Sequence, residues 1–99
     1  MDTIRTHAAL MADGLSLSIT SEDLKEMFAP YGRVIWTRVV MDQFRRSMSY
    51  GYVVMATRAE ADRAIQALDM QFRNERILKV VRTEIPPLPH AVFGVKECT

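Results

Sequence analysis

The chain is 99 residues long, with 48% hydrophobic and 25% charged residues, which fits one globular domain and excludes a disordered chain. Its formal net charge of +1 neither requires nor rules out a polyanionic partner. No apolar run approaches the roughly 20 residues that cross a bilayer, and the amino-terminal segment lacks the continuous apolar stretch of a signal peptide. We therefore expect an intracellular protein, cytoplasmic or nuclear, that does not enter a membrane.

The charges are distributed unevenly along the chain. Residues 33–52 carry four cations against one acid, and residues 73–82 carry the same excess, whereas residues 21–28 carry three acids against one lysine. A near-neutral domain with this distribution can be basic on one side and acidic on another, and a basic side attracts nucleic acid.

Side chains typical of catalysis or metal binding are scarce. Cys98 is the single cysteine, which excludes an intrachain disulfide and a cysteine-based zinc site. His7 and His90 are far apart and have no companion ligands at metal-site spacing. We find no acid pair, no nucleophile beside a base and no glycine-rich phosphate loop. The sequence therefore predicts no metal, no cofactor, no catalytic residues and no enzymatic activity.

Four strands and two amphipathic helices are predicted in alternation. After a first apolar run, Thr20 caps a helix whose apolar residues recur at helical spacing until Pro30. Two β-branched, aromatic segments follow, and Thr57 with Glu60 then forms a capping box before the second helix and a last apolar run. The predicted strands cover residues 8–12, 34–41, 50–56 and 77–81.

The order strand, helix, strand, strand, helix, strand is that of a split βαβ arrangement. We predict an α+β, ferredoxin-like βαββαβ sandwich, in which a four-stranded antiparallel sheet carries both helices on one face. Residues 1–84 form this domain, and a proline-containing C-terminal tail covers residues 85–99. The other face of the sheet is left open.

The residues on the open face are predicted from the alternation of side chains along each strand. Gly51 and Val53 can face the helices, which leaves Tyr50 and Tyr52 on the open side. Aromatic rings at the centre of a bare sheet need a ligand, a partner or a lid. Aromatic rings among cations suit single-stranded nucleic acid, because each base can stack on a ring at about 1–3 kcal/mol while cations neutralise phosphates. The same alternation adds Met11, Trp36, Arg38 and Lys79 to this side, although a one-residue bulge would turn Trp36 into the core.

Residues 48–55 read Met-Ser-Tyr-Gly-Tyr-Val-Val-Met and resemble the octamer motif of RNA recognition motifs. Residues 10–15 lie where the hexamer motif of that family would fall, and the resemblance extends over residues 6–83. It implies RNA binding, with bases stacked on Tyr50 and Tyr52. Four positions depart from the family pattern: Met11 replaces the hexamer's aromatic residue, Asp13 its glycine, Met48 the octamer's leading cation and Ser49 its first glycine.

The residue pattern and the resemblance together predict binding of single-stranded RNA, with single-stranded DNA as a further ligand, by ring stacking and phosphate contacts. The alternative is a protein-interaction module, in which the sheet face is covered by the chain's own tail, by a second copy or by a protein partner. The apolar residues 91–95 favour this alternative. The predicted RNA-binding residues are Tyr50, Tyr52, Met11, Trp36, Arg38, Arg46, Lys79 and Arg82.

Overall fold

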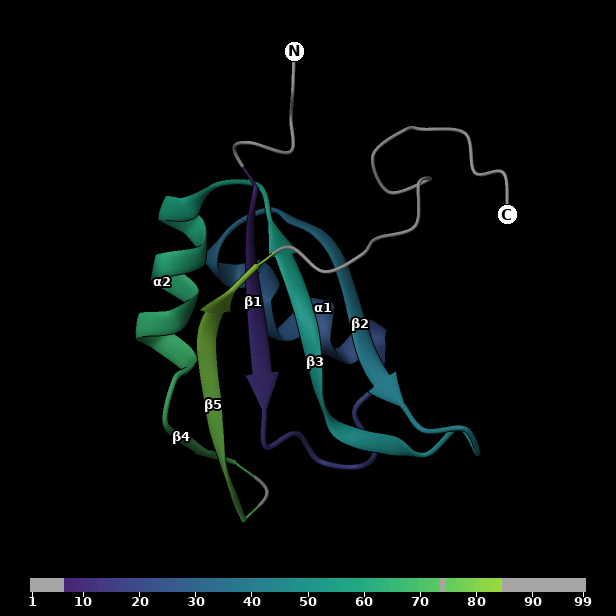
Figure 1. Ribbon diagram of the computed structural model, residues 1–99. Helices are drawn as coiled ribbons and strands as arrows, with labels where there is room; N and C mark the ends of the chain where they lie inside the picture. Colours follow the sequence, from purple (N-terminus) through teal and green to yellow (C-terminus); the bar gives the residue numbers. More distant parts are fainter. Residues whose placement is uncertain (1–6, 74, 85–99) are drawn as a thin grey trace, which may run out of the picture.

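The computed structural model describes residues 7–73 and 75–84, which form two helices packed on an antiparallel sheet (Figure 1). The predicted C-terminal tail, residues 85–99, lies outside the described residues. None of the described helices is long and apolar enough to cross a membrane. The elements are β1 (Ala8–Asp13), α1 (Ser21–Phe28), the short 3-10 helix η2 (Ala29–Tyr31), β2 (Val34–Met41), β3 (Ser47–Met55), α2 (Arg58–Leu68), β4 (Gln71–Arg73) and β5 (Arg76–Thr83).

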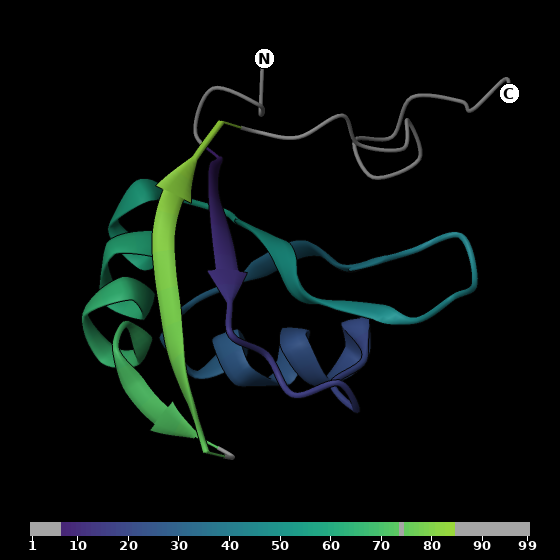
Figure 2. The same cartoon turned by 60° about the horizontal axis from the view of Figure 1, so that its bottom comes forward.

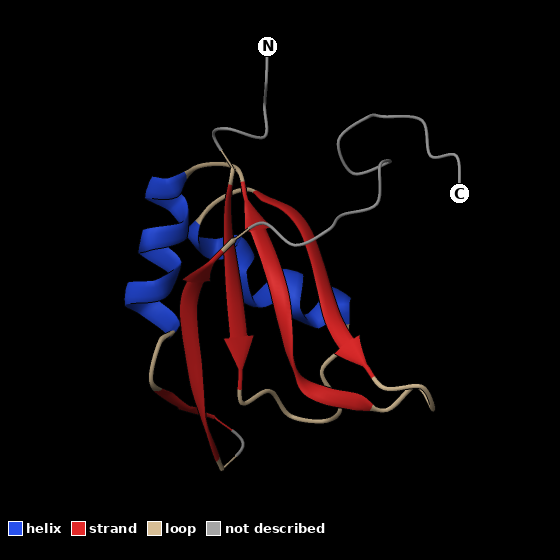
Figure 3. Ribbon diagram, viewed as in Figure 1, coloured by secondary structure: helices blue, strands red, loops and turns tan. Residues whose placement is uncertain are grey.

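The strands lie in the order β2-β3-β1-β5-β4, and every pair is antiparallel. Both helices lie on the same side of this sheet (Figures 2 and 3). The predicted ferredoxin-like fold is confirmed, but the described sheet has five strands rather than four. The additional strand, β4, is a three-residue edge strand that pairs with the start of β5. Its sequence lacks the β-branched run that would have predicted a strand.

Each helix begins at a threonine that accepts a backbone hydrogen bond. The Thr20 hydroxyl accepts from the N–H of Asp23 (3.1 Å), and the Asp23 carboxylate accepts from the N–H of Thr20 (3.0 Å), which completes a capping box at the start of α1. The Thr57 hydroxyl accepts from the N–H of Glu60 (3.2 Å) at the start of α2. These bonds satisfy N–H groups that have no partner within the helix.

The core lies between the helices and the inner side of the sheet. Alternate residues of the two central strands point into it: Leu10 and Ala12 from β1, and Val53 and Met55 from β3, are fully buried. Each buried leucine or valine side chain stabilises the folded state by about 1.5–3 kcal/mol. Gly51 and Val53, which were predicted to face the helices, are both buried. The same layer is completed by Leu24 and Phe28 of α1, Ala61, Ala64 and Leu68 of α2, and Leu78 and Val80 of β5.

Glu60 ties the start of α2 to the start of β2. One carboxylate oxygen accepts from the N–H of Arg33 (3.2 Å), and the other accepts from the Thr57 hydroxyl (3.1 Å). The hydrogen bond from the Arg33 N–H is the largest cause of a pKa for Glu60 that lies below its ordinary value. The ionised carboxylate is thus the form that the fold favours.

Replacing Glu60 by glutamine should reduce the loss of stability that accompanies a fall in pH. Because the folded-state pKa of Glu60 is lowered, its contribution is fully present above the ordinary pKa of 4.5 and is lost as the pH falls through the folded-state pKa. Denaturant unfolding, followed from neutral pH to below pH 4.5, should show a smaller loss in the free energy of unfolding for Glu60→Gln than for the wild type. Equal losses in the two proteins would contradict this role.

Two positions of the octamer in β3 have backbone environments that suit glycine, but only one of them is glycine. Gly51 is buried, and a Cβ atom there would lie 2.5 Å from the carbonyl oxygen of Arg38 on β2. Ser49 has a φ of 68°, in the left-handed region that glycine adopts most easily. In this conformation its carbonyl oxygen accepts from the N–H groups of Gly14 (3.0 Å) and Leu15 (2.9 Å), which fixes the chain leaving β1. Gly51 is therefore sterically required, whereas Ser49 is strained.

Substitutions at these two positions should change stability in opposite directions. Gly51→Ala should lower the free energy of unfolding by about 1–3 kcal/mol, because its methyl group must displace backbone. Ser49→Gly should raise it by up to about 1 kcal/mol, because glycine removes the left-handed strain. Both values come from denaturant unfolding of the single variants. A stabilised Gly51→Ala or a destabilised Ser49→Gly would mean that the β3 backbone differs from the one described.

Candidate nucleic-acid interface

The face of the sheet away from the helices carries a row of side chains that crosses four strands. Tyr52 on β3 pairs with Arg38 on β2 and with Met11 on β1, and Met11 pairs in turn with Val81 on β5. These residues alternate with the buried ones, so their side chains point outward. Tyr52 and Met11 are half-buried, while Arg38 and Val81 are exposed. The row brings a ring, a thioether and a guanidinium together on one surface.

A second row lies beside the first, toward the end of β1. Tyr50 on β3 pairs with Asp13 on β1, which pairs with Lys79 on β5. Tyr50 is half-buried, and the two charged residues are exposed. Directly paired residues have Cβ atoms about 5 Å apart, so the acid stands between the ring and the ammonium group. The row combines an aromatic platform with one charge of each sign.

A third row, on the other side of the first, contains Trp36. Trp36 pairs with Val54 on β3, which pairs with Ala9 on β1. The register shifts between Val34 and Trp36, so Ile35 is an extra residue that forms a bulge. The bulge precedes Trp36, and the tryptophan stays on the open face instead of turning into the core. Trp36 is half-buried, and its neighbours Val54 and Ala9 are buried outside the helix-side core.

The rings of Tyr50 and Tyr52 contact each other edge to face. Their centroids are 6.1 Å apart, and the ring planes meet at 82°. Such a pair is worth about 0.5–1.5 kcal/mol beyond the area that it buries. The two rings therefore present differently oriented surfaces, and a ligand that stacks parallel on both must turn one of them.

Arg82 is separated from the other predicted residues. Its guanidinium bonds the carboxylate of Asp62 on α2, with Nη2 and Nε 3.1 Å and 3.2 Å from Oδ1. Like the buried Val80, Arg82 lies on the helix side of β5, whereas Lys79 lies on the open side. Arg82 was predicted to be an RNA-binding residue without being assigned to a face, and the structure places it on the side opposite to Lys79.

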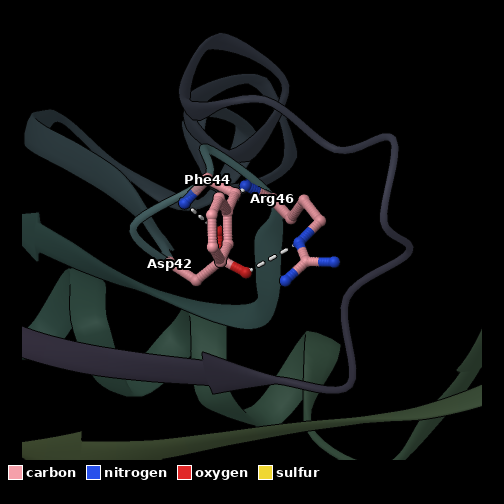
Figure 4. Close-up of polar contacts among 3 residues, drawn as sticks. All are labelled: Asp42, Phe44 and Arg46. Carbon is pink, nitrogen blue, oxygen red and sulfur yellow. Dashed lines mark hydrogen bonds and ion pairs between the residues drawn. The ribbon is translucent and has the colours of Figure 1, made fainter.

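The β2–β3 loop extends beyond the sheet (Figure 2) and is organised around Asp42. Its carboxylate accepts from the N–H of Phe44 (2.7 Å), from the N–H of Arg46 (2.9 Å) and from the Arg46 Nε (2.9 Å), as Figure 4 shows. The hydrogen bond from the Arg46 N–H is the main cause of a lowered pKa for Asp42. The guanidinium of Arg46 lies over the Phe44 ring, 5.0 Å from its centroid. The Arg46 side chain is 71% exposed. Arg46 is therefore oriented, and part of its charge is offset by Asp42.

A shallow hollow connects this loop with the segment that follows β1. Its cationic lining comes from the loop, and its apolar wall comes from Leu17, which is 62% exposed. The hollow is open to solvent, and the side chains of Arg45 and Arg46 are exposed in it. It is lined by Leu17, Asp42, Arg45, Arg46 and Ser47.

The sequence reasoning missed two apolar residues on the β4–β5 hairpin. Phe72 pairs with Ile77, and their side chains are 73% and 51% exposed. Ile77 lies two residues before Lys79 and shares its face, so alternation along β5 would have found it. Phe72 could not be found in this way, because β4 itself was not predicted.

The predicted absence of a metal, a cofactor and catalysis stays a prediction. In the described ranges, no three His, Cys, Asp or Glu side chains lie together as metal ligands would. His90 and Cys98, which were considered as metal ligands, lie outside those ranges.

Comparison with known families decides what kind of domain this is. The sequence pattern of the RNA recognition motif matches residues 10–79, which is most of the chain. The chain belongs to the RNA recognition motif family. The family prediction made from the octamer and hexamer is thereby confirmed.

Curated proteins of the same family are longer than this chain. Glycine-rich RNA-binding protein 3, mitochondrial, from Arabidopsis thaliana is 38% identical over 72 residues, covering 72% of this chain and 23% of that protein. Serine/arginine-rich splicing factor SR45a from the same plant is 33% identical over 93 residues, covering 89% of this chain and 24% of that protein. The chain thus spans about a quarter of the length of these two relatives, and the likeness is limited to that part of each.

Solved structures share the fold. The crystal structure of RNA Binding Protein PG1 matches with a TM-score of 0.78 and 30% identity, over 82% of this chain and 99% of that one. A Sex-lethal protein in complex with RNA matches with a TM-score of 0.71 and 26% identity, over 76% of this chain and 47% of that one. The five-stranded RNA recognition motif described above therefore has the architecture of known RNA-binding proteins.

Proposed function

We propose that this RNA recognition motif binds single-stranded RNA on the open face of its sheet. The observation that carries the proposal is the position of Tyr50 and Tyr52, two half-buried rings on the central strand β3 at the family's stacking positions. Membership of the family and RNA-binding relatives support it. Sequence-specific recognition of RNA is directed at single strands, whose unstacked bases can lie on aromatic rings.

In the proposed complex, each tyrosine ring supports one base. Met11, next to Tyr52, contributes a polarizable but non-aromatic contact, which is weaker than the ring that the family has at this position. Trp36 flanks the pair from β2. The edge-to-face contact between the tyrosines is lost when both rings stack on bases. This loss reduces the favourable free energy of binding by about 0.5–1.5 kcal/mol. We therefore expect a weak to moderate affinity.

The proposed phosphate contacts come from cations around the rings. Arg38 and Lys79 are exposed on opposite sides of the tyrosines. Within residues 7–73 and 75–84 neither has an ion-pair partner, so both charges are available to a polyanion. Arg46 adds a contact from the β2–β3 loop, reduced by its pairing with Asp42. Arg82 is left out of the proposed interface because it lies on the helix side of β5, where it pairs with Asp62.

The proposal concerns binding without chemistry. Single-stranded DNA offers the same bases and phosphates and is expected to bind by the same contacts, apart from those made to the 2′-hydroxyl. The cytoplasmic or nuclear location expected from the sequence stays a prediction.

The double variant Tyr50→Ala, Tyr52→Ala should lose about 2–5 kcal/mol of RNA-binding free energy, because two stacking surfaces are removed. The fold should persist, since both rings lie outside the helix-side core. Affinity is measured by titrating a randomised pool of short single-stranded RNA into labelled protein and following backbone amide NMR shifts. The matched control is Tyr50→Phe, Tyr52→Phe, which keeps the rings and should keep most of the affinity. If the alanine variant binds as tightly as the wild type, stacking on these rings is not the mechanism.

Lys79→Ala and Arg82→Ala should separate a cation on the open face from one on the helix side. Each neutralised phosphate in single-stranded RNA contributes about 0.7 to the slope of log affinity against log salt. Lys79→Ala should reduce that slope by about 0.7, whereas Arg82→Ala should leave it unchanged. Titrations between about 50 and 200 mM salt measure both slopes. If Arg82→Ala reduced the slope more than Lys79→Ala, the RNA would lie on the helix side of β5, and the proposed open-face interface would be contradicted.

The second candidate function is a protein-interaction module. It is favoured by exposed apolar side chains on the β4–β5 hairpin, where Met70, Phe72 and Ile77 are all more than half exposed. The chain's tail, one of the partners considered, lies outside the described residues. The two functions differ in their response to salt, because an apolar interface is nearly indifferent to it and an RNA surface is not.

A further inference from the structure

Asp13 is an acid on a surface proposed to bind a polyanion. It occupies the family's hexamer glycine position, at the end of β1, between Tyr50 and Lys79 in one cross-strand row. Its side chain is exposed, and among the described residues it accepts one hydrogen bond, from the N–H of Gly14 to Oδ1 (2.8 Å). That bond orients the carboxylate and leaves most of its acceptor positions open.

The charge of Asp13 restricts what can lie against it. A carboxylate repels phosphate oxygens and base carbonyl oxygens, and it accepts hydrogen bonds without donating any. A nucleotide whose base stacks on Tyr50 therefore gains from Asp13 only through a donor. The 2′-hydroxyl is a donor in every ribonucleotide and selects no base, so selection requires a donor-bearing base edge turned toward β1. Lys79 stands one strand further on, about 5 Å beyond, and its flexible stem carries donors only. The row thus offers a ring, then acceptors, then donors.

Guanine matches this order best among the four bases. Its N1–H and its 2-amino group are neighbouring donors, which fit the two oxygens of one carboxylate, and its O6 is an acceptor beside them for the ammonium group. Uracil presents a single N–H between two carbonyl oxygens. Adenine and cytosine present an amino group next to a ring nitrogen that is itself an acceptor. With these three bases at least one contact to the carboxylate is missing or repulsive.

We infer that Asp13, together with Tyr50 and Lys79, forms a subsite that selects a guanine base in single-stranded RNA. Tyr50 supports the base by stacking, and Asp13 accepts from its N1–H and 2-amino group. Lys79 has three donors, of which one reaches O6 and the others remain for a phosphate. The inference rests on the proposed function, because it needs a base on Tyr50. It assigns to Asp13 a role in specificity, since the same carboxylate weakens binding of every sequence that lacks guanine.

Fluorescence anisotropy with short oligouridine RNAs tests the subsite. One central uridine is left in place or replaced by guanosine, inosine, adenosine or cytidine. The guanosine RNA should bind the wild type on the order of tenfold tighter than the uridine, adenosine and cytidine RNAs, the discrimination expected of a bidentate contact. Inosine, which lacks only the 2-amino group, should fall between them.

The variant Asp13→Asn keeps the side-chain oxygen that accepts from Gly14, so it should fold, but it replaces one acceptor by a donor and removes the charge. It should bind the guanosine and uridine RNAs with similar affinity, and the uridine RNA should bind no more weakly than it does to the wild type. The control Glu26→Gln makes the same charge change on an exposed position of α1, and it should retain the guanosine preference.

The outcomes separate this inference from the function on which it rests. RNA binding by the wild type without a guanosine preference, or a preference that survives in Asp13→Asn, would overturn the guanine subsite and leave RNA binding standing. Loss of the preference in Glu26→Gln as well would attribute it to net charge and would also overturn the subsite. No binding of any of the RNAs by the wild type would overturn the proposed function and the subsite together.

Discussion

The packing of α1 and α2 against β1 and β3 decides which side chains remain for a ligand. Strand residues alternate strictly between two faces, so each buried residue on the helix side sends its neighbours to the other side. Burial of Leu10 and Val53 leaves Met11 and Tyr52 outward, and these two are paired across the central strands. A slip of one residue would bury a tyrosine hydroxyl and expose the core. The open face is therefore as strongly specified as the core, although it contributes less to stability.

Backbone constraints in β3 hold this register. Gly51 lets β2 and α1 approach the strand closely, and no other residue fits there without moving backbone. Ser49, in the left-handed region, turns its carbonyl oxygen toward the chain that leaves β1. That contact fixes the end of β1, where Asp13 stands beside Tyr50. The strain at Ser49 thus lies next to the proposed binding surface, where strained backbone is commonly retained.

The sequence predicted the fold and the central part of the face because both depend on periodicity alone. Val53 inward and Tyr52 outward follow from alternation and need no knowledge of neighbouring strands. Two features depended on more than periodicity. The short strand β4 is defined by its pairing with β5 and has no pattern of its own. The bulge at Ile35 arises from a register between two strands that one sequence does not display.

Arg82 is a different case, because periodicity along β5 already contained the face on which it lies. Lys79 and Arg82 are three residues apart on one strand, so they must face opposite sides. Counting both as cations of one basic segment ignores this difference in face. Arg82 in fact pairs with Asp62 of α2, on the helix side. A charge count along the sequence is a weak guide to a surface unless it is divided between the two faces of each strand.

Assigning residues to faces and cross-strand rows also changes how the departures from the family pattern are interpreted. Counted along the sequence, Met11 and Asp13 weaken the hexamer, one by losing a ring and the other by adding an acid. On the face they lie in different rows: Met11 beside Tyr52, Asp13 beside Tyr50. In the proposed complex, the methionine of the Tyr52 row offers a base a weaker contact than the family's aromatic residue. In the Tyr50 row the acid opposes phosphate but can favour one base edge over others. Under the two proposals, both substitutions reduce general affinity, and only Asp13 gives the surface a means of discriminating between bases.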